Sequence, residues 1–296
     1  MLTRRCLMIA PAALAGFAWF AAAPAAAASL ISTRFEAALR QIERHSRGRL
    51  GVCVLDTLTD QRSGWNENDR FPICSTFKLL AAAAVLQRVD RGQEQLDRRV
   101  TIRSEDIVVY SPVTKERIGR AGVTMAELCE AAMTWSDNTA ANLILASLGG
   151  PDAITGFVRS LGDTKTRLDR TEPDLNAAVP GDPRDTTTPT AMLNNIQALV
   201  LGDALSAGSR DHLTGWLLGN QTGNQRLRAG MPAGWRCGEK TGSGDHGTSN
   251  DVGVAWPPQR PPIIVTAYLT EARTDFKQRE ATLADVGRAV ATAFAG

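Results

Sequence analysis

Patterns typical of β-strands occur near the two ends of this 296-residue chain, and helical patterns fill the middle. The continuous apolar run at residues 50–56 predicts a buried strand, and a shorter strand is expected near residues 63–66. Strand patterns return only toward the C-terminus, at residues 235–241, 251–256 and 263–270. A sheet assembled from both ends of the chain, with helices inserted between its strands, best explains this order. We therefore expect an α+β fold, with an antiparallel sheet flanked by helices and an inserted all-helical lobe.

The helical patterns divide the chain into two lobes. They cover residues 76–89, 124–148, 189–201, 209–218 and 276–294. Residues 29–68 and 219–296 are expected to form an α/β lobe, and residues 69–218 the all-helical lobe. This layout leaves a cleft between the lobes. Residues 161–189 are rich in Pro, Asp and Thr and lack periodicity, and a loop of that length inside a compact domain is either disordered or functional.

The first 28 residues have the pattern of an export signal. An arginine pair is followed by an apolar stretch at residues 7–20 and an alanine-rich run at residues 21–28, with cleavage expected after Ala28. A membrane anchor is the alternative, but the apolar core is shorter than the ~20 residues that span a bilayer. The arginine pair also fits a twin-arginine signal. We expect an exported protein, periplasmic or secreted, with no membrane contact after cleavage.

Charge and metal-ligand spacing exclude several classes of function. Removing the signal takes away two arginines and no acids, so 33 Lys+Arg become 31, against 31 Asp+Glu. This balance gives no indication of nucleic-acid binding. The three histidines form no His-x-His or His-x-x-x-His pair, which argues against a zinc hydrolase, and we expect no metal or other cofactor. The four cysteines of the mature chain are expected to be mostly buried thiols; they are Cys53, Cys74, Cys129 and Cys237.

Ser75-Thr76-Phe77-Lys78 is the first of four short motifs that together indicate a serine acyl-transfer site. If a helix starts near Ser75, both Ser75 and Lys78 project from one face of its first turn. Lysine can then accept the serine proton, provided that burial or nearby positive charge lowers its pKa. A helix N-terminus also favours the negative charge that develops on attack. The alternative, an N-cap serine beside an exposed lysine, fits this motif when it is taken alone.

Three further motifs follow in order, and their conjunction carries the information. Ser136-Asp137-Asn138 opens a helix, so Ser136 or Asp137 is also expected to cap it. Lys240-Thr241-Gly242 ends a strand pattern, where a cation and a hydroxyl suit an anionic, amide-like substrate and glycine permits close backbone approach. Glu172-Pro173-Asp174-Leu175-Asn176 lies between these two motifs, in the loop at residues 161–189.

With these motifs in this order, the chain resembles a class A β-lactamase. The resemblance covers essentially the whole mature sequence, including residues 110–113, 170–185 and 232–235 and the C-terminal strands. It implies hydrolysis of the β-lactam ring of penicillins and cephalosporins, and hence antibiotic resistance, by a monomeric enzyme. It also implies that Arg170 and Asp185 close the loop that carries Glu172 with an ion pair.

The resemblance assigns the catalytic steps to a small set of residues. Ser75 is the nucleophile, and Ser136 delivers a proton to the leaving nitrogen. Lys78 and Glu172 share the proton transfer of acylation, in an order that is disputed for the family. Glu172 and Asn176 orient the water that hydrolyses the acyl-enzyme.

The remaining predicted residues bind the substrate. By the same resemblance, the backbone amides of Ser75 and Ser243 form the oxyanion hole. Lys240, Thr241 and Ser243 hold the substrate carboxylate, Asn138 binds its side-chain amide, and Tyr110 walls the cleft.

The chain departs from the family pattern at the carboxylate site. Many members place an arginine on the strand after the Lys-Thr-Gly motif, and here that position is Ser249. Arg226 stands where other members supply the guanidinium instead, so we expect it to take this role.

Two cysteines match halves of family disulfides whose other halves are missing here. The partner position of Cys74 is Gly244, and that of Cys129 is Ala82, so we expect neither bridge. Carbapenemase activity is therefore not implied. Residues 243–245 resemble those of members that accept bulky oxyimino-cephalosporins.

Two other functions share part of the motif set. One is a D-alanyl-D-alanine peptidase, and the other is a drug-sensing domain that stays acylated. Glu172 and Asn176 speak against both, because these residues are expected to activate the water that releases the acyl group. A sensor would also need a retained membrane segment, and a structural protein would not need four convergent motifs.

Overall fold

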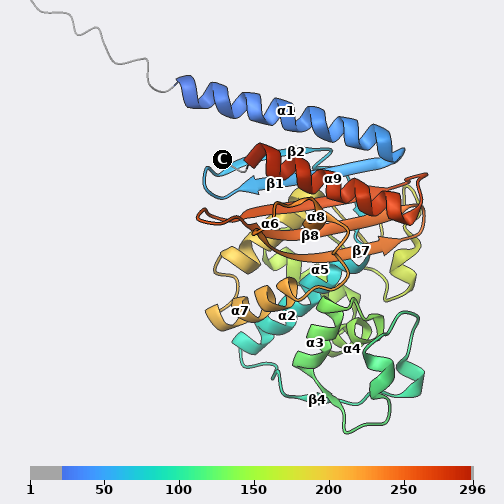
Figure 1. Cartoon of the computed structure of the whole chain (residues 1–296). Helices are drawn as coiled ribbons and strands as arrows, with labels where there is room; N and C mark the ends of the chain where they lie inside the picture. Colours follow the sequence, from blue (N-terminus) through green and yellow to red (C-terminus); the bar gives the residue numbers. More distant parts are fainter. Residues whose placement is uncertain (1–21, 295–296) are drawn as a thin grey trace, which may run out of the picture.

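The computed structural model describes residues 22–294, and its centre is one five-stranded antiparallel sheet (Figure 1). The strand order is β2-β1-β9-β8-β7. The strands are β1 (Arg49–Asp56), β2 (Gln61–Trp65), β7 (Arg236–Gly244), β8 (Thr248–Trp256) and β9 (Ile263–Thr270). The first and last parts of the chain join where β1 pairs with β9, from Arg49 opposite Thr270 to Asp56 opposite Ile263. The predicted fold class is confirmed.

Both faces of the sheet are buried, and β1 shows how the sequence achieves this. Successive side chains of a strand point to opposite faces. Leu50, Val52 and Val54 pack in one cluster with apolar residues of α1 (Ala22–Ser46) and α9 (Phe276–Phe294), whereas Cys53 and Leu55 join the core on the other face. Figure 1 shows α1 and α9 side by side on the same face of the sheet. The continuous apolar run in the sequence therefore reflects a strand in the middle of a layered structure.

The remaining helices lie beyond the second face of the sheet, where α6 and α7 contact its strands and the others pack against these helices and one another. They are α2 (Phe77–Asp90), α3 (Met125–Thr134), α4 (Asn138–Leu148), α5 (Pro151–Ser160), α6 (Pro189–Ile196) and α7 (Ala207–Leu218), with the short α8 (Leu227–Gly230) on the face of α9. Helix α2 is buried without interruption from Phe77 to Leu86, which explains why its sequence is apolar all round. Burying one large aliphatic side chain contributes roughly 1.5–3 kcal/mol, so α2 anchors this part of the fold.

Three features differ from the prediction. Helix α5 was not predicted, although Pro151 suits the first turn of a helix and Ile154, Phe157 and Val158 share its buried face. The region expected to be all-helical also contains two short antiparallel ladders, β3 (Phe71–Pro72) with β6 (Thr186–Thr187) and β4 (Arg99–Val100) with β5 (Val123–Thr124). Helix α1 begins at Ala22, within the predicted signal segment, because alanine has the highest helix propensity. The rest of that segment, residues 1–21, lies outside the described residues.

Single turns of helix complete the secondary structure. They are η1 (Cys74–Thr76), η2 (Ser104–Asp106), η3 (Thr114–Arg117), η4 (Asp174–Ala177) and η5 (Gln197–Leu201). No helix within residues 22–294 is long and apolar enough to cross a membrane.

The loop at residues 161–189 is ordered by its own polar contacts. Arg170 Nε lies 2.6 Å from Asp185 Oδ2, so the predicted ion pair is present. Asp185 Oδ1 also accepts the backbone amides of Asp169 and Arg170, at 2.7 and 3.0 Å. A buried carboxylate with several donors fixes geometry more than it adds stability. The pair therefore holds the two ends of the loop together and sets the position of Glu172 between them.

All four cysteines of the described chain are unpaired, buried thiols, as predicted. Burial raises the pKa of the Cys74 and Cys129 thiols, so both react slowly in the folded protein. We expect thiol titration of the protein cleaved after Ala28 to find four reactive thiols in denaturant without reductant, and fewer in native buffer. Two or fewer thiols in denaturant would reveal a disulfide.

Candidate active site

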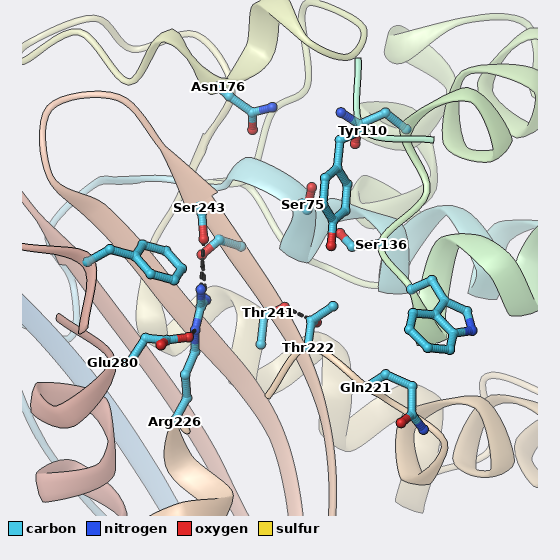
Figure 2. Close-up of a pocket in the computed structure, with 14 residues that line it drawn as sticks. Ser75, Tyr110, Ser136, Asn176, Gln221, Thr222, Arg226, Thr241, Ser243 and Glu280 are labelled. Atoms are coloured by element: carbon cyan, nitrogen blue, oxygen red, sulfur yellow. Dashed lines mark hydrogen bonds and ion pairs between the residues drawn. The ribbon is translucent and has the colours of Figure 1, made fainter. Parts of the chain in front are cut away.

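Ser75 lies at the floor of a cleft of about 510 Å³ (Figure 2). It belongs to the turn η1, which leads directly into α2. The sequence prediction of a serine at a helix N-terminus is therefore correct within one turn. Gly242 of β7 passes so close that a Cβ on it would lie 3.2 Å from the Ser75 amide nitrogen. The strand that carries Lys240 and Thr241 thus approaches the backbone of Ser75.

Three residues around the cleft have left-handed backbone conformations. The φ angles are 44° for Cys74, 61° for Tyr110 and 56° for Ser136. Such conformations cost roughly 1–3 kcal/mol each for residues other than glycine, and they persist only where the surrounding structure imposes them. The backbone is therefore strained immediately before Ser75 and at Ser136, both predicted site residues.

Glu172 connects the nucleophile to the lysine. Ser75 Oγ donates a hydrogen bond of 2.8 Å to Glu172 Oε1, and Lys78 Nζ lies 3.0 Å from the same oxygen. The Lys78 and Glu172 side chains are completely buried. Spacing in the sequence suggested direct proton transfer from Ser75 to Lys78. In the structure the Ser75 hydroxyl donates to Glu172 instead, and Lys78 contacts Glu172 in turn.

Lys78 has further partners that fix its amino group. Nζ donates to the backbone oxygen of Ser136 at 2.7 Å and to Asn138 Oδ1 at 2.6 Å, and it lies 3.3 Å from Ser136 Oγ. Burial lowers the pKa of Lys78, and the charge of Glu172 opposes part of that effect. The lysine can therefore give up and take back a proton more readily than a lysine in water.

Ser136 lies between two lysines. Its Oγ is within 3.0 Å of Lys240 Nζ as well as near Lys78 Nζ. Burial lowers the pKa of Lys240 well below its usual range, and the charges of Lys78 and Arg226 act in the same direction. Lys240 also donates to the backbone oxygen of Thr241 at 2.8 Å. The serine hydroxyl is thus held in a defined place with proton donors on two sides.

Asp137 provides the predicted helix cap and has a second task. Its Oδ1 accepts the Ala140 amide at 2.8 Å, which caps α4. Its Oδ2 accepts the amides of Val113 and Thr114, both at 2.9 Å. One buried carboxylate therefore ties the loop that follows Tyr110 to the start of α4.

Arg226 lines the cleft beside Ser243, another residue that the resemblance assigns to the substrate carboxylate. Figure 2 shows its guanidinium joined to Ser243, and Nη2 lies 2.8 Å from Ser243 Oγ. Nη1 donates to the backbone oxygens of Gly242 and Asn250, each at 2.8 Å. Ser249, which occupies the other arginine position of the family, instead accepts a 3.3 Å hydrogen bond from Arg279 Nε.

Asn142 was not predicted, yet it positions the backbone of Glu172. Its Oδ1 accepts the Glu172 amide at 2.9 Å, and its Nδ2 donates to the Glu172 carbonyl at 2.8 Å. The Glu172–Pro173 peptide bond is cis. Asn142 stands four residues after Asn138, so both lie on the same side of α4. That four-residue spacing was the only feature of the sequence that could have indicated a role for Asn142 in the site.

Asn176 contacts the other oxygen of the same carboxylate. Its Nδ2 donates to Glu172 Oε2, while its buried Oδ1 accepts no hydrogen bond from any residue in the range 22–294. A buried acceptor without a partner is costly unless a molecule from solution supplies the donor. This atom therefore favours the prediction that Asn176 helps to hold a water.

Five residues that were not predicted also line the cleft. They are Trp135, Gln221, Thr222, Phe276 and Glu280. Trp135 directly precedes the Ser136 motif, whereas the others come from separate segments that meet only in the fold. Thr222 contributes a hydroxyl contact of 2.5 Å to Thr241. Together with Tyr110, Trp135 and Phe276 place three half-exposed aromatic rings around the opening.

A second pair of buried carboxyls lies beside this site. Burial raises the pKa of Asp251 to about 6 and raises that of Glu239 well above its usual range, and Asp251 adds to the effect on Glu239. Asp251 Oδ2 accepts the Leu227 amide at 3.1 Å, and Glu239 Oε1 lies 3.1 Å from Arg228 Nε. The pair thus supports the segment that follows Arg226.

We expect this pair to make the protein less stable as the pH rises from about 4 to above 6. The raised folded-state pKa means that the native protein binds protons which the unfolded chain releases, so stability is full at low pH and falls through pH 6. Raising the pKa of Asp251 to about 6 in the folded protein corresponds to a loss on the order of 3 kcal/mol in the free energy of unfolding. Urea unfolding across this range should show the loss in wild type and a smaller loss in Glu239→Gln. The same change of unfolding free energy with pH in wild type and in the variant would contradict the assignment of this effect to the Asp251–Glu239 pair.

A buried carboxylate in contact with a serine hydroxyl, with a lysine on its other side, is the arrangement of a serine hydrolase that works through an acyl-enzyme. Comparisons with known proteins identify the family. Residues 34–294 match the model of the β-lactamase enzyme family. β-Lactamase OXY-1 of Klebsiella oxytoca is 46% identical over 252 residues, which are 85% of this chain and 86% of that protein. A β-lactamase of Streptomyces fradiae is 48% identical over 277 residues, 92% of this chain and 90% of that protein.

Solved structures give the same result. An ancestral (GNCA) class A β-lactamase superposes with a TM-score of 0.87 at 60% identity, covering 88% of this chain and all of the other. A putative class A β-lactamase from Rhodopseudomonas palustris has the same TM-score and coverage at 57% identity. The chain belongs to the β-lactamase enzyme family and is a class A member. It is a hydrolase of β-lactams and thus an enzyme of antibiotic resistance.

Proposed function

We propose that acylation moves one proton around a ring of contacts. Ser75 passes its proton to Glu172 as Oγ attacks the lactam carbonyl, because this hydrogen bond is already formed, at 2.8 Å. Glu172 then passes a proton to Lys78, which is 3.0 Å away, and Lys78 passes a proton to Ser136. Ser136 protonates the lactam nitrogen as the C–N bond breaks. The amides of Ser75 and Ser243 stabilise the oxyanion.

Deacylation uses the same carboxylate with Asn176. Glu172 takes a proton from a water whose oxygen attacks the ester carbonyl, and it passes a proton to Ser75 Oγ as the ester C–O bond breaks, which restores the serine hydroxyl and the carboxylate. The observation that carries this proposal is the contact of Glu172 with both Ser75 Oγ and Asn176, together with the unpaired Asn176 Oδ1. A D-alanyl-D-alanine peptidase or a drug sensor does not need this arrangement.

The substrate carboxylate lies against Lys240, Thr241, Ser243 and Arg226. Arg226 supplies positive charge, and the Lys240 amino group and the two hydroxyls supply hydrogen bonds. Asn138 binds the side-chain amide of the substrate through the hydrogen-bonding capacity that its contact to Lys78 does not use. Tyr110, which is 56% exposed, forms one wall of the cleft. The hydroxyl of Ser243 and the small Gly244 fit the further proposal that oxyimino-cephalosporins are accepted.

The activity is tested by nitrocefin hydrolysis, followed by a panel of penicillins, cephalosporins and carbapenems. Ser75→Ala should abolish turnover while the protein stays folded. Nitrocefin left intact by pure wild-type protein would refute the proposed function.

Arg226→Ala should lower kcat/KM for penicillins roughly ten- to a hundredfold. A hydrogen bond to a charged group contributes ~1.5–3 kcal/mol, and the substrate carboxylate loses its guanidinium partner. Steady-state kinetics of Arg226→Ala and Ser249→Ala, each checked for its melting temperature, measure the effect. A strong loss in Ser249→Ala with none in Arg226→Ala would show that the carboxylate binds elsewhere.

The enzyme is further proposed to act as an exported monomer. The arginine pair, apolar stretch and alanine-rich run of residues 1–28 motivate the first part. N-terminal sequencing of the expressed protein should begin at Ser29, and light scattering should give a mass near that of one mature chain. An intact N-terminus or a dimer mass would contradict the respective part.

A further inference from the structure

Phe276, the first residue of α9, is an exposed aromatic side chain in the wall of the cleft. It is 48% exposed, and it lines the same cavity as Ser75 and Thr241. A single exposed apolar residue is ordinary on a protein surface. The contacts that hold the Phe276 ring in place, however, are unusual for an exposed side chain.

Two guanidinium groups lie near the Phe276 ring. The central carbons of Arg226 and Arg279 each lie 5.6 Å from the ring centroid, within the range of a cation–π interaction. Neither cation is free to move away. Arg226 is fixed by Gly242, Asn250 and Ser243, and Arg279 donates to the Thr274 carbonyl at 2.8 Å and to Ser249. The ring is therefore held in one orientation without being covered.

The place of the ring relative to the carboxylate site gives it a task, and this step rests on the proposed function. Arg226 donates to Ser243 and also lies 5.6 Å from the Phe276 ring centroid (Figure 2 marks the Arg226–Ser243 contact with a dashed line). In a cephalosporin, the carbon that bears the carboxylate is bonded to C3, the carbon that carries the variable substituent. When the carboxylate is bound at Arg226, the C3 substituent starts from the neighbouring carbon, and Phe276 is the aromatic side chain of the cleft that lies beside the same guanidinium. Penicillins have no substituent of this kind.

We propose that Phe276 is a specificity-determining residue that packs against flat, uncharged aromatic substituents at C3 of cephalosporins. Aromatic rings pair at centroid distances of about 4.5–7 Å, and a ring that is already oriented loses little conformational freedom when it pairs. The charges around the ring are balanced. Arg226 and Arg279 are both cationic, whereas Glu280, 3.5 Å from Arg226 Nε, and Asp275, which acts on Arg279, are carboxylates. The ring therefore offers apolar contact without a net charge beside it, which suits an uncharged substituent.

The test compares two cephalosporins that share one C7 side chain, one with a C3 methyl group and one with an uncharged heteroarylthiomethyl group. The ratio of their kcat/KM values should fall about two- to tenfold in Phe276→Ala, in line with the loss of one aromatic pair. Phe276→Trp should restore the ratio, and Phe276→Leu should not. Lys277→Ala, at an exposed position one residue along α9, should leave it unchanged.

Benzylpenicillin separates this proposal from a structural effect on Arg226. Its kcat/KM should stay within twofold in Phe276→Ala, since it carries no substituent equivalent to the cephalosporin C3 group. An unchanged cephalosporin ratio, or an equal loss for all three substrates, would overturn the role of Phe276. If wild type hydrolyses none of the three, the proposed function has failed instead.

Discussion

Replacing Glu172 with alanine should leave Ser75 able to take up the acyl group of a penicillin and should almost stop its release. Ser75 loses its hydrogen-bond acceptor, but Lys78, with a lowered pKa, remains nearby to accept the proton. The ester then has no carboxylate to activate water. A well-placed general base contributes ~10²–10⁴ in rate, so turnover should fall by about that factor.

Intact mass spectrometry distinguishes the outcomes. The Glu172→Ala variant should show a persistent adduct on Ser75 after mixing with penicillin, and wild type should return to free enzyme. Asp174→Asn is the matched control, because Asp174 is an exposed carboxylate two residues along the same loop, and it should turn over normally. An equally persistent adduct in wild type would favour a drug sensor. Undiminished turnover in the variant would mean that another group activates the water.

Replacing Lys78 with alanine should slow the acylation step itself. Glu172 could still accept the serine proton, but the path from Glu172 to Ser136 would be interrupted, so the lactam nitrogen would leave without its proton. We expect a loss of ~10²–10⁴ in the acylation rate. The variant should also be less stable by ~3–5 kcal/mol, because it leaves a buried carboxylate without its ion-pair partner.

Single-turnover kinetics with nitrocefin measure acylation directly, and urea unfolding measures stability. Lys115→Ala, a change at an exposed lysine, should alter neither. The two variants thus have opposite signatures: an adduct accumulates without Glu172 and fails to form without Lys78. Rapid adduct formation in Lys78→Ala would remove the lysine from the acylation path and leave Glu172 as its base.

The sequence predicted most of the architecture because the strands of the central sheet have distinctive patterns. Residues 50–56 are apolar on both faces, and β9 matches its predicted range of residues 263–270. The register between these strands could not be predicted, since it depends on contacts between distant segments. Helix α5 was not predicted because it is only 10 residues long and stands between the helical pattern that ends at residue 148 and the loop that begins at residue 161.

The motifs in the sequence indicated which residues belong to the site, but the contacts between these residues are seen only in the folded structure. Ser75 and Lys78 were recognisable as a pair, but only coordinates reveal that Glu172, almost a hundred residues away, lies between them. Asn142 and Phe276 belong to no motif: one contacts the backbone of Glu172, and the other contacts the guanidinium of Arg226. Contacts of this kind leave almost no trace in local sequence.

Helix α4 has a consequence for how the site keeps its geometry. Its first turn presents Asn138 to Lys78, and its second presents Asn142 to the backbone of Glu172. Lys78 comes from α2 and Glu172 from the loop at residues 161–189, so one rigid helix contacts groups from two separate segments. Helix α4 therefore acts as the common reference that sets the spacing between the lysine and the carboxylate.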